Sequence, residues 1–412
     1  MHNEPVAMTH AIASLLERFH ASRKYSTDLI LHLSPEDCQA QSMDDASPAK
    51  WHLAHVTWFY EVMVLKQFEP SFEFWNPHYA VLFNSYYNGV GDKHPRPKRG
   101  LLTRPSLTEV LDWRRNIDQR VITLLSSDQC TDCAWLIELG INHEQQHQEL
   151  LLTDIQHLFF NNSLYPAYSP GRLSAVERSG FEWVSGSSGL QEVGYTGPDF
   201  HFDNESPRHT TFLQPHAISN SLIKNHEWLA FIHSGGYEQS RWWLDEGWAW
   251  VQRERITAPL YWIQSGDSLA LSRFSLGGQL PLDLEAPVTN ISYFEADAFA
   301  RWASESIPDY AGARLPTEFE WEVFAQTHQQ KSHDLFGVAW QWTRSPYSAY
   351  PGYQPWGGIA GEYNGKFMVN QMVLRGSSAY TTTGHSRLSY RNFFPTHARW
   401  QMTGLRLARD SG

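Results

Sequence analysis

The chain has 412 residues, which is more than one ordinary hydrophobic core needs and therefore predicts two domains. Hydrophobic residues make up 42% of the chain, and no apolar run reaches the roughly 18 residues of a membrane span, so we expect a soluble protein without a membrane partner. The net charge of -12 opposes a nucleic-acid-binding surface, which would need a basic patch.

The first residues of the sequence and its cysteines predict a cytoplasmic protein. Residues 1–5 lack the basic stretch and apolar core that open a secretory signal. The cysteines are few and odd in number (Cys38, Cys130 and Cys133), which suits a reducing compartment.

The first part of the chain has the periodicity of helices. Apolar residues recur at helical spacing over about 10–33, and a second helix follows Ser47, which we expect to be its N-cap, and runs to residue 65. A third helix is predicted from Ser106 to about residue 126, and a fourth over about 133–160. Four antiparallel helices with side chains projecting inward are a common way to build a metal site.

A long segment without helical periodicity, residues 70–105, separates the second and third helices. It is rich in aromatic residues, glycine, proline and arginine. A segment this long inside a compact domain is usually functional or disordered, and its aromatic content argues against disorder.

The second part of the chain has a different texture. Residues 166–180 read as a linker, so we predict a helical domain over 1–165 and a second domain over 181–412. In the second domain short strands and loops surround helices at about 225–233, 292–304 and 317–327. The expected fold class is therefore α+β with two domains.

The fourth helix carries two histidines, His143 and His147, on one face because they are four residues apart. The second helix places His55 on its core-facing stripe, which makes it the best candidate for a third ligand. Separate core histidines are the plainer interpretation. Three imidazoles leave up to three open positions on an octahedral ion, a set that suits Fe(II), whereas Glu149 lies off this face.

The same residues satisfy the HExxH pattern of zinc peptidases, in which Glu144 would be the general base. Those enzymes need a third protein ligand. Position 150 is a leucine, and no glutamate occurs over residues 150–176. A zinc hydrolase is therefore the less favoured alternative.

With Leu-Ala-His55 upstream, the HxxxHxE pair resembles the DinB-type domain of the ergothioneine-biosynthesis sulfoxide synthases. The second domain resembles the formylglycine-generating-enzyme (sulfatase-modifying factor) fold, which is C-type-lectin-like. Five segments carry this second resemblance, at 286–292, 314–322, 340–343, 374–378 and 403–407. The two resemblances together cover nearly the whole chain and imply a four-helix bundle followed by an α+β domain.

The resemblance implies a mononuclear non-haem Fe(II) held by His55, His143 and His147, with O₂ as co-substrate. It implies that the enzyme joins the sulfur of cysteine to the imidazole carbon of hercynine (Nα-trimethylhistidine) and oxidises the sulfur to a sulfoxide. We expect a monomer or a homodimer. A cationic headgroup also explains the aromatic content of 14%, since aromatic walls bind quaternary ammonium groups.

Further residues take roles by position in the family pattern. Gln146 would contact the substrate imidazole, and Asn392 and Phe393 would lie near the trimethylammonium and carboxylate groups. Members that use γ-glutamylcysteine carry an acidic residue where this chain has Phe394, so the resemblance favours the branch that uses free cysteine. In that branch the loop tyrosines, here Tyr86 and Tyr87, are catalytic, and we expect one to be a general acid. Three basic residues of the loop are candidates to pair with the donor's carboxylate: Arg96, Arg99 and Arg104.

The sequence departs from the branch at one informative place. Residues 375–378 read Arg-Gly-Ser-Ser, where the branch usually has Arg-Gly-Gly-Ser. Related synthases couple hercynine to a selenosugar and make selenoneine, which stays the alternative function. A formylglycine-forming activity is not expected, because no cysteine follows Cys133.

Overall fold

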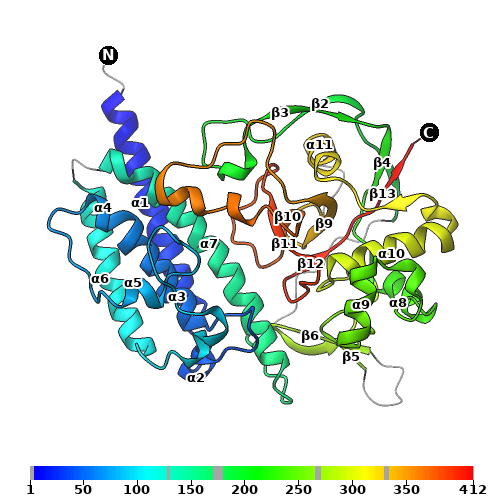
Figure 1. Cartoon of the computed structure of the whole chain (residues 1–412), viewed down its shortest axis with the longest axis horizontal. Helices are drawn as coiled ribbons and strands as arrows, with labels where there is room; N and C mark the ends of the chain where they lie inside the picture. The colour runs from blue at the N-terminus through cyan, green and yellow to red at the C-terminus, as the bar shows by residue number, and fades with distance from the viewer. Residues whose placement is uncertain (1–3, 128–129, 170–179, 265–270, 329–333, 412) are drawn as a thin grey trace. The chain divides into compact units, whose positions relative to one another are not determined.

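The computed structural model describes residues 4–127, 130–169, 180–264, 271–328 and 334–411. The chain divides into two compact units, which Figure 1 shows in the colours of the chain. The first is Met1–Ser169 together with Gly357–Tyr363, and the second is Pro170–Trp356 together with Asn364–Gly412. The predicted α+β fold with two domains is confirmed. The return of Gly357–Tyr363 to the helical unit had no signal in the sequence, and most of the predicted linker lies outside the described residues.

The first unit is a helical bundle whose main contacts join α7 to α1 and to α3, and α3 to α6. Its described helices are α1 (Glu4–Asp28), α2 (Pro35–Gln39), α3 (Ala49–Phe59), the π-helix η1 (Tyr60–Leu65), α4 (Lys66–Phe68), α5 (Tyr79–Leu82), α6 (Leu107–Leu125) and α7 (Cys130–Phe160), with 3-10 turns η2 (Arg96–Leu101) and η6 (Gly358–Glu362). The four predicted helices are present, and α2, α5 and the short turns were not predicted.

The helix ends show which local signals were informative. The third helix begins at Ser106 as predicted, and Ser106 also caps it. Its hydroxyl accepts from the Glu109 amide while the Glu109 carboxylate accepts from the Ser106 amide. The first helix ends at Asp28, earlier than expected, and turns follow it. The expectation that Ser47 caps α3 was wrong: Pro48 occupies that position, and the Ser47 hydroxyl accepts a hydrogen bond from Arg99 instead.

A glycine sets the approach of η1 to α7. A Cβ atom at Gly140 would lie 2.6 Å from Cε1 of Tyr60, closer than real contacts allow. Tyr60 is fully buried, so its ring cannot move aside into solvent. Gly140 therefore lets the Tyr60 ring pack directly on α7, within one turn of His143.

The second unit is built from strands with helices packed on them. Its described helical segments are η3 (Asp203–Glu205), α8 (Asn225–His233), η4 (Ser240–Trp242), α9 (Asp245–Glu254), α10 (Tyr293–Ser306), η5 (Pro308–Tyr310), α11 (Glu318–His328) and η7 (Gly365–Phe367). Its strands are β1 (Trp183–Ser185), β2 (Gly189–Val193), β3 (His209–Leu213), β4 (His216–Ser219), β5 (Trp262–Gln264), β6 (Leu271–Ser275), β7 (Gly278–Pro281), β8 (Ala313–Arg314), β9 (Ala339–Pro346), β10 (Gln371–Ser377), β11 (Asn392–Pro395), β12 (Thr403–Gly404) and β13 (Ala408–Asp410). Helices α8, α10 and α11 confirm the three predicted ones, and α9 was missed.

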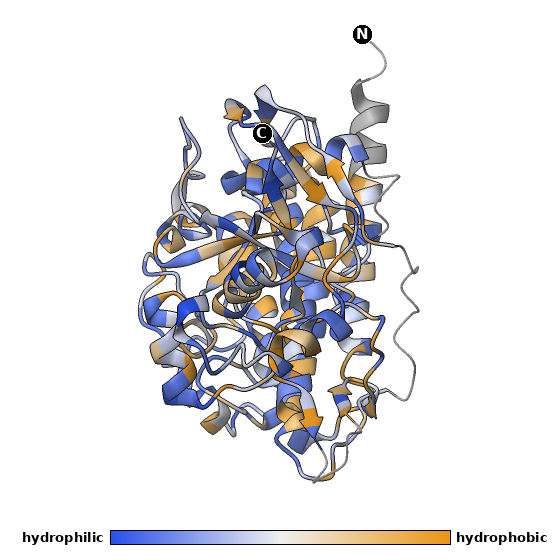
Figure 2. Ribbon diagram, turned by 90° about the vertical axis from the view of Figure 1, so that its right-hand side faces the viewer, coloured by the Kyte–Doolittle hydropathy of each residue, from blue (hydrophilic) through white to orange (hydrophobic). Residues whose placement is uncertain are grey.

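The strands form small sheets rather than one large one. The described strands are ordered β1-β4-β13-β8 and β11-β10-β9-β12 in two four-stranded sheets, with a β5-β6-β7 sheet and a β2-β3 ribbon beside them. Helix α11 packs on β9 and β10 and places Trp321 and Phe324 in the core. Figure 2 shows that hydrophobic and hydrophilic stretches alternate along the helices and strands, as one-sided burial requires.

A buried network of charges holds the end of α11 to β10. Glu318 accepts hydrogen bonds from Arg375 and Arg391, and Glu322 accepts one from Arg375. The backbone at Gly376 has a φ of +92°, and a Cβ atom there would meet the Leu335 carbonyl oxygen at 2.4 Å, so this position requires glycine.

Candidate metal centre

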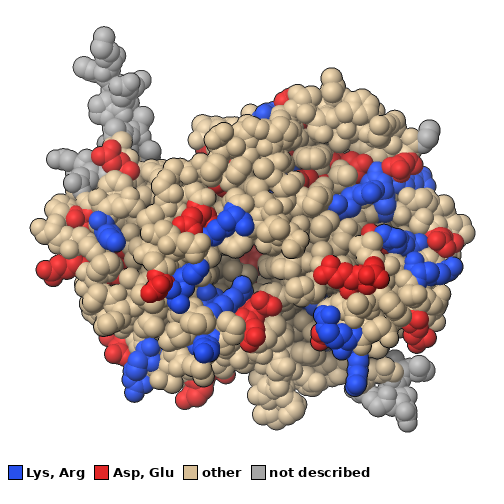
Figure 3. Space-filling view, viewed as in Figure 1, with Lys and Arg blue, Asp and Glu red and all other residues tan. Residues whose placement is uncertain are grey.

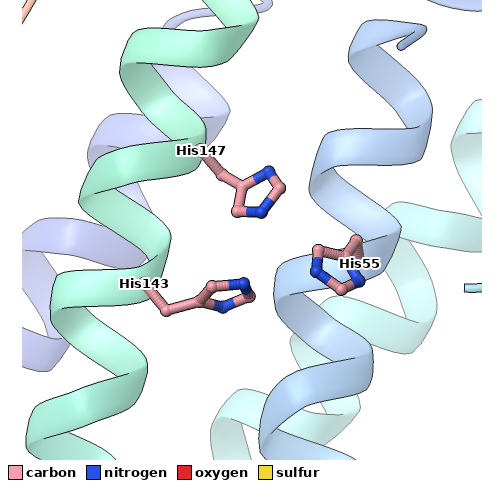
Figure 4. A group of neighbouring side chains, drawn as sticks. All are labelled: His55, His143 and His147. Atoms are coloured by element: carbon pink, nitrogen blue, oxygen red, sulfur yellow. The ribbon is translucent and has the colours of Figure 1, made fainter. Parts of the chain in front are cut away.

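Three histidines of the first unit point toward one another from two helices. His55 projects from α3, and His143 and His147 project from successive turns of α7 (Figure 4). One potential ligand nitrogen from each ring lies within 4.8 Å of the other two. Among the described residues, this is the group of His, Cys, Asp or Glu side chains that converges in the way a metal site requires. Glu149 is not a member of the group, in agreement with its predicted position off this face.

The hydrogen bonds of these rings leave several buried nitrogens without a partner. Nδ1 of His55 donates to the carbonyl oxygen of Phe83 at 2.7 Å, and its Nε2 is buried without a hydrogen-bond partner. Both ring nitrogens of His143 are likewise buried and unpartnered. Buried polar atoms without partners are costly in a folded protein, and a bound cation would satisfy them. The residues present therefore fit a divalent metal ion.

The environment keeps these imidazoles neutral, which is the form that binds a metal. Burial lowers the pKa of His143 to about 3. Burial also takes the pKa values of His55 and His147 well below their usual value, and the neighbouring imidazoles act in the same direction. The site is thus prepared for a cation at neutral pH.

Large rings hold the ligands in place. The His55 ring is stacked on Trp51 at 4.7 Å and on Trp58 at 5.5 Å between centroids. The His143 ring lies 4.7 Å from that of Phe59. Because α3 is buried over its whole length, these rings are fixed by packing as well as by hydrogen bonds.

Glu144 points away from the three imidazoles and takes part in a buried ion cluster. Its carboxylate accepts hydrogen bonds from Arg23 at 3.0 Å, from Ser26 at 2.6 Å and from Arg114. Burial alone would raise the pKa of Glu144, but Arg114 and Arg23 lower it to about 2. A carboxylate held by two guanidinium groups cannot serve as the base of a zinc peptidase, so the structure disfavours that alternative.

The predicted tyrosine pair is linked to the histidine cluster through its loop. Asn84 follows the carbonyl that binds His55, and its side chain donates to the Tyr87 carbonyl at 2.9 Å while accepting from the Tyr87 amide at 3.0 Å. The hydroxyls of Tyr86 and Tyr87 lie 3.3 Å apart, and the Tyr87 ring packs 5.5 Å from that of Trp58. Burial raises the pKa of Tyr87 well above its usual value, so its hydroxyl stays protonated.

The returning segment Gly357–Tyr363 contributes residues that the sequence did not reveal. The Glu362 carboxylate accepts from the amides of Asn88 at 2.9 Å and Gly89 at 2.7 Å, which fixes the segment against the tyrosine loop. Tyr363 then places its ring 5.8 Å from that of His143, and its hydroxyl donates to Oε1 of Gln146. The predicted substrate contact Gln146 therefore lies beside the histidine cluster and is held by Tyr363.

The three candidate arginines have different surroundings. Arg96 and Arg104 are exposed and donate to backbone carbonyls of Asp45 and Thr103. Arg99 is buried, stacks 3.4 Å over the Trp51 ring, and donates to the hydroxyls of Ser47 and Ser85. Burial lowers the pKa of Arg99 to about 9, so the group is still charged at neutral pH.

The remaining predicted contacts lie in the second unit. Asn392, Phe393 and Phe394 form part of β11, and the Phe393 ring stacks on Tyr347 at 4.0 Å. Their role toward a substrate stays a prediction. Ser377, the residue that departs from the usual family pattern, is buried, and its hydroxyl accepts from the Gly337 amide at 2.8 Å. That bond gives Ser377 a role within the fold, so the departure is weak support for a change of donor.

Charged side chains of both signs lie on the surface of the protein (Figure 3). Figure 3 shows acidic and basic side chains interspersed over the face that it draws. Within the described ranges, no helix is both long enough and apolar enough to cross a bilayer.

Comparison with known families defines the class of protein. The chain carries a domain of the DinB superfamily, matched over residues 18–151, followed by a sulfatase-modifying factor enzyme 1-like domain, matched over residues 174–333. The predicted combination of these two domains is confirmed.

The chain is also similar to individual proteins. Over 88% of its length the chain is 28% identical to a protein named hercynine oxygenase from Mycolicibacterium thermoresistibile, of which the match covers 87%. A hercynine oxygenase from Mycolicibacterium smegmatis is also 28% identical, over 88% of this chain and 91% of that protein. Ergothioneine biosynthesis protein 1 from Schizosaccharomyces pombe is 26% identical over 51% of this chain and 28% of its own length.

Proposed function

We propose that the chain is a non-haem Fe(II), O₂-dependent sulfoxide synthase of ergothioneine biosynthesis. It would join the imidazole carbon of hercynine to the sulfur of cysteine and oxidise that sulfur. The observation that carries the proposal is the convergence of three neutral histidines, His55, His143 and His147, in a chain similar to hercynine oxygenases over most of its length. Buried nitrogens of His55 and His143 have no hydrogen-bond partner.

The overall reaction balances with O₂ as the oxidant. One C–H bond of hercynine and the S–H bond of cysteine are broken, and a C–S bond and an S–O bond are formed. The second oxygen atom leaves as water with the two hydrogens. Four electrons pass to O₂, two from C–S coupling and two from sulfur oxidation, and a bound iron would supply this redox chemistry.

An all-histidine donor set fits iron with open positions, and the surroundings of Glu144 oppose a zinc peptidase. A three-imidazole site leaves room for O₂ and a substrate atom on one ion. The carboxylate that a zinc peptidase would use is held by Arg23 and Arg114. Both features favour an oxygenase, in agreement with the names of the relatives.

Gln146 is suited to recognise the imidazole of hercynine. It lies one turn from His143, and its carbonyl oxygen is occupied by Tyr363. In this orientation we propose that the amide NH₂ group of Gln146 donates to a ring nitrogen of the substrate. For the trimethylammonium group we propose Asn392, Phe393 and Phe394, because aromatic surface of the kind formed by Phe393 and Tyr347 attracts quaternary ammonium ions.

Arg99 is the best of the three arginines to bind the carboxylate of the thiol donor. It is a buried cation with an unpartnered Nε, and among the described residues it has no carboxylate within ion-pair distance. Its stacking on Trp51 places it one ring away from His55, since Trp51 stacks on His55 in turn. A substrate carboxylate would supply the missing counter-charge.

We assign proton delivery to the pair Tyr86 and Tyr87. A general acid must hold its proton at neutral pH, and the raised pKa of Tyr87 meets this requirement. The contact between the two hydroxyls allows a proton to pass from one to the other.

The donor is tested by one parallel assay. Purified protein loaded with Fe(II) is given O₂, hercynine and one of three donors: cysteine, γ-glutamylcysteine or a selenosugar, and products are identified by mass. We expect the sulfoxide from cysteine to form fastest. A selenium-containing product as the main species would establish the selenoneine alternative instead, and no product from any donor would overturn the proposed class of reaction.

A further inference from the structure

A second histidine of α3, His52, connects a ligand of the metal centre to a buried carboxylate. Nδ1 of His52 lies 2.9 Å from Nδ1 of His147, and Nε2 of His52 lies 3.0 Å from Oδ2 of Asp154. His52 and Asp154 are 4% and 6% exposed, so neither contact is shared with bulk water. His52 is not a member of the converging ligand group.

The chemistry of the two imidazoles and the carboxylate determines which group donates each hydrogen bond. An ionised carboxylate only accepts, so Nε2 of His52 carries a proton and donates to Asp154. In a neutral His52 the other nitrogen, Nδ1, then holds a lone pair. Two nitrogens 2.9 Å apart need one donor and one acceptor, so Nδ1–H of His147 donates to His52.

The protonation of Nδ1 determines the state of the other ring nitrogen of His147, Nε2. Once Nδ1 carries the proton, Nε2 has the lone pair that a metal needs. His55 reaches the same state by another route, since its Nδ1–H donates to the carbonyl of Phe83. Both rings would then bind through Nε2.

We propose that Asp154 and His52 form a positioning pair that fixes the tautomer of His147 and strengthens it as a metal ligand. The inference rests on the proposed metal centre and deepens it. Because His52 belongs to α3 and Asp154 to α7, the pair also fastens the two ligand-bearing helices to each other. A hydrogen-bond acceptor of this type raises the basicity of a metal-binding imidazole, and its loss typically costs about 10–100-fold in metal affinity.

Asp154 extends the connection to the start of α3. The same Oδ2 atom accepts a hydrogen bond from the Ser47 amide at 2.8 Å. The Ser47 hydroxyl accepts in turn from Arg99. The carboxylate therefore fixes Ser47, which contacts the proposed donor-binding Arg99, as well as orienting His147 through His52.

The test is the affinity for the metal alone, measured by calorimetry with Co(II) and, without oxygen, Fe(II). His52→Phe keeps an aromatic ring but removes the acceptor, and we expect the affinity to fall about 10–100-fold. His52→Asn places an amide oxygen near the position of Nδ1 and should recover most of that loss. In Asp154→Asn the side chain can still accept from Ser47 and His52 but lacks the charge. The metal affinity of this variant should therefore lie between those of the wild type and His52→Phe.

A nuclear magnetic resonance measurement gives a second readout that packing alone would not change. In the Zn(II)-loaded protein, the imidazole ¹⁵N shifts should show His147 bound through Nε2 with a proton on Nδ1. Binding through Nδ1 would overturn the proposal, as would a folded His52→Phe protein with affinity within twofold of the wild type. Equal affinities of His52→Asn and His52→Phe would also contradict it.

These readouts are independent of the reaction catalysed. No hercynine or thiol is present, so a failure of the proposed reaction would leave them unaffected. His143→Ala is the positive control, because loss of a ligand should abolish tight binding whatever the role of His52. If His52→Phe does not fold, Asp154→Asn and the ¹⁵N spectrum of the wild type still decide the question.

Discussion

The hydroxyl of Tyr363 donates a hydrogen bond to Oε1 of Gln146, although 217 residues separate the two in the chain. Gln146 lies on α7 between the two histidines of that helix, and Tyr363 ends the segment Gly357–Tyr363, which returns to the helical unit. The bond orients the amide of Gln146 with its NH₂ group away from Tyr363. This orientation supports Gln146 as a donor to the substrate imidazole.

Tyr363→Phe should therefore weaken hercynine binding without weakening metal binding. Loss of one hydrogen bond of about 1 kcal/mol corresponds to a rise in KM for hercynine of about fivefold. Tyr168→Phe is a matched control, because its hydroxyl donates to the Leu29 carbonyl in the same unit. Its ring contacts His32, and none of its contacts with described residues involves the three histidines. An unchanged KM for hercynine in Tyr363→Phe would show that the hydrogen bond from Tyr363 is not required for substrate binding by Gln146.

Tyr87→Phe should slow product formation far more than it weakens metal binding. Removal of a general acid typically costs about 10²-fold or more in rate, and the Tyr87 ring itself is kept by phenylalanine. Steady-state rates and Co(II) affinity of Tyr86→Phe and Tyr87→Phe should be compared. If both variants react at the wild-type rate, the proton comes from elsewhere.

Arg99→Gln should raise KM for the thiol donor. A hydrogen bond to a charged group contributes about 1.5–3 kcal/mol, so a rise of about 10-fold or more is expected. Arg96→Gln is the control, because Arg96 is exposed and its bond is to the backbone of Asp45. Equal effects of the two changes would remove the reason for preferring Arg99.

The metal-free protein should lose stability as the pH falls below about 6.5. Burial lowers the pKa of His143 to about 3 in the folded protein, so below its usual pKa the unfolded chain binds more protons than the folded one. The contribution of neutral His143 to the free energy of unfolding is complete above pH 6.5 and decreases as the pH falls toward 3. Between pH 7 and 5.5 the loss from this one group is about 1 kcal/mol.

Denaturant unfolding at the two pH values measures this loss. His143→Gln removes the titrating group. Between pH 7 and 5.5 the free energy of unfolding of this variant should therefore fall by about 1 kcal/mol less than that of the wild type. Identical pH dependence of the wild type and His143→Gln would mean that His143 is protonated in the folded protein, contrary to its buried setting.

Periodicity and spacing were sufficient for the helical bundle and the histidine cluster. The i, i+4 spacing of His143 and His147 and the core-facing stripe of α3 are local properties, and they survive in the structure because the helices form as expected. The capping box at Ser106 is likewise read from four neighbouring residues.

Contacts between distant segments could not be predicted in the same way. The pairing of His52 with Asp154 depends on the register of α3 against α7, which no local pattern encodes. The return of Tyr363 depends on two hydrogen bonds from backbone amides to Glu362, and backbone donors leave no trace in residue types. Ser47 does not cap α3 because Pro48 occupies that position, and the Ser47 hydroxyl instead accepts from Arg99, which lies far along the chain.

The most direct test of the central claim is the fate of ¹⁸O₂ in the complete reaction. Protein loaded with Fe(II) is mixed with hercynine, cysteine and ¹⁸O₂, and the product is weighed by mass spectrometry. The account predicts a product that joins both substrates, lacks two hydrogen atoms and contains one ¹⁸O atom, with none formed by His143→Ala. A sulfoxide without ¹⁸O, or full activity in that variant, would contradict it.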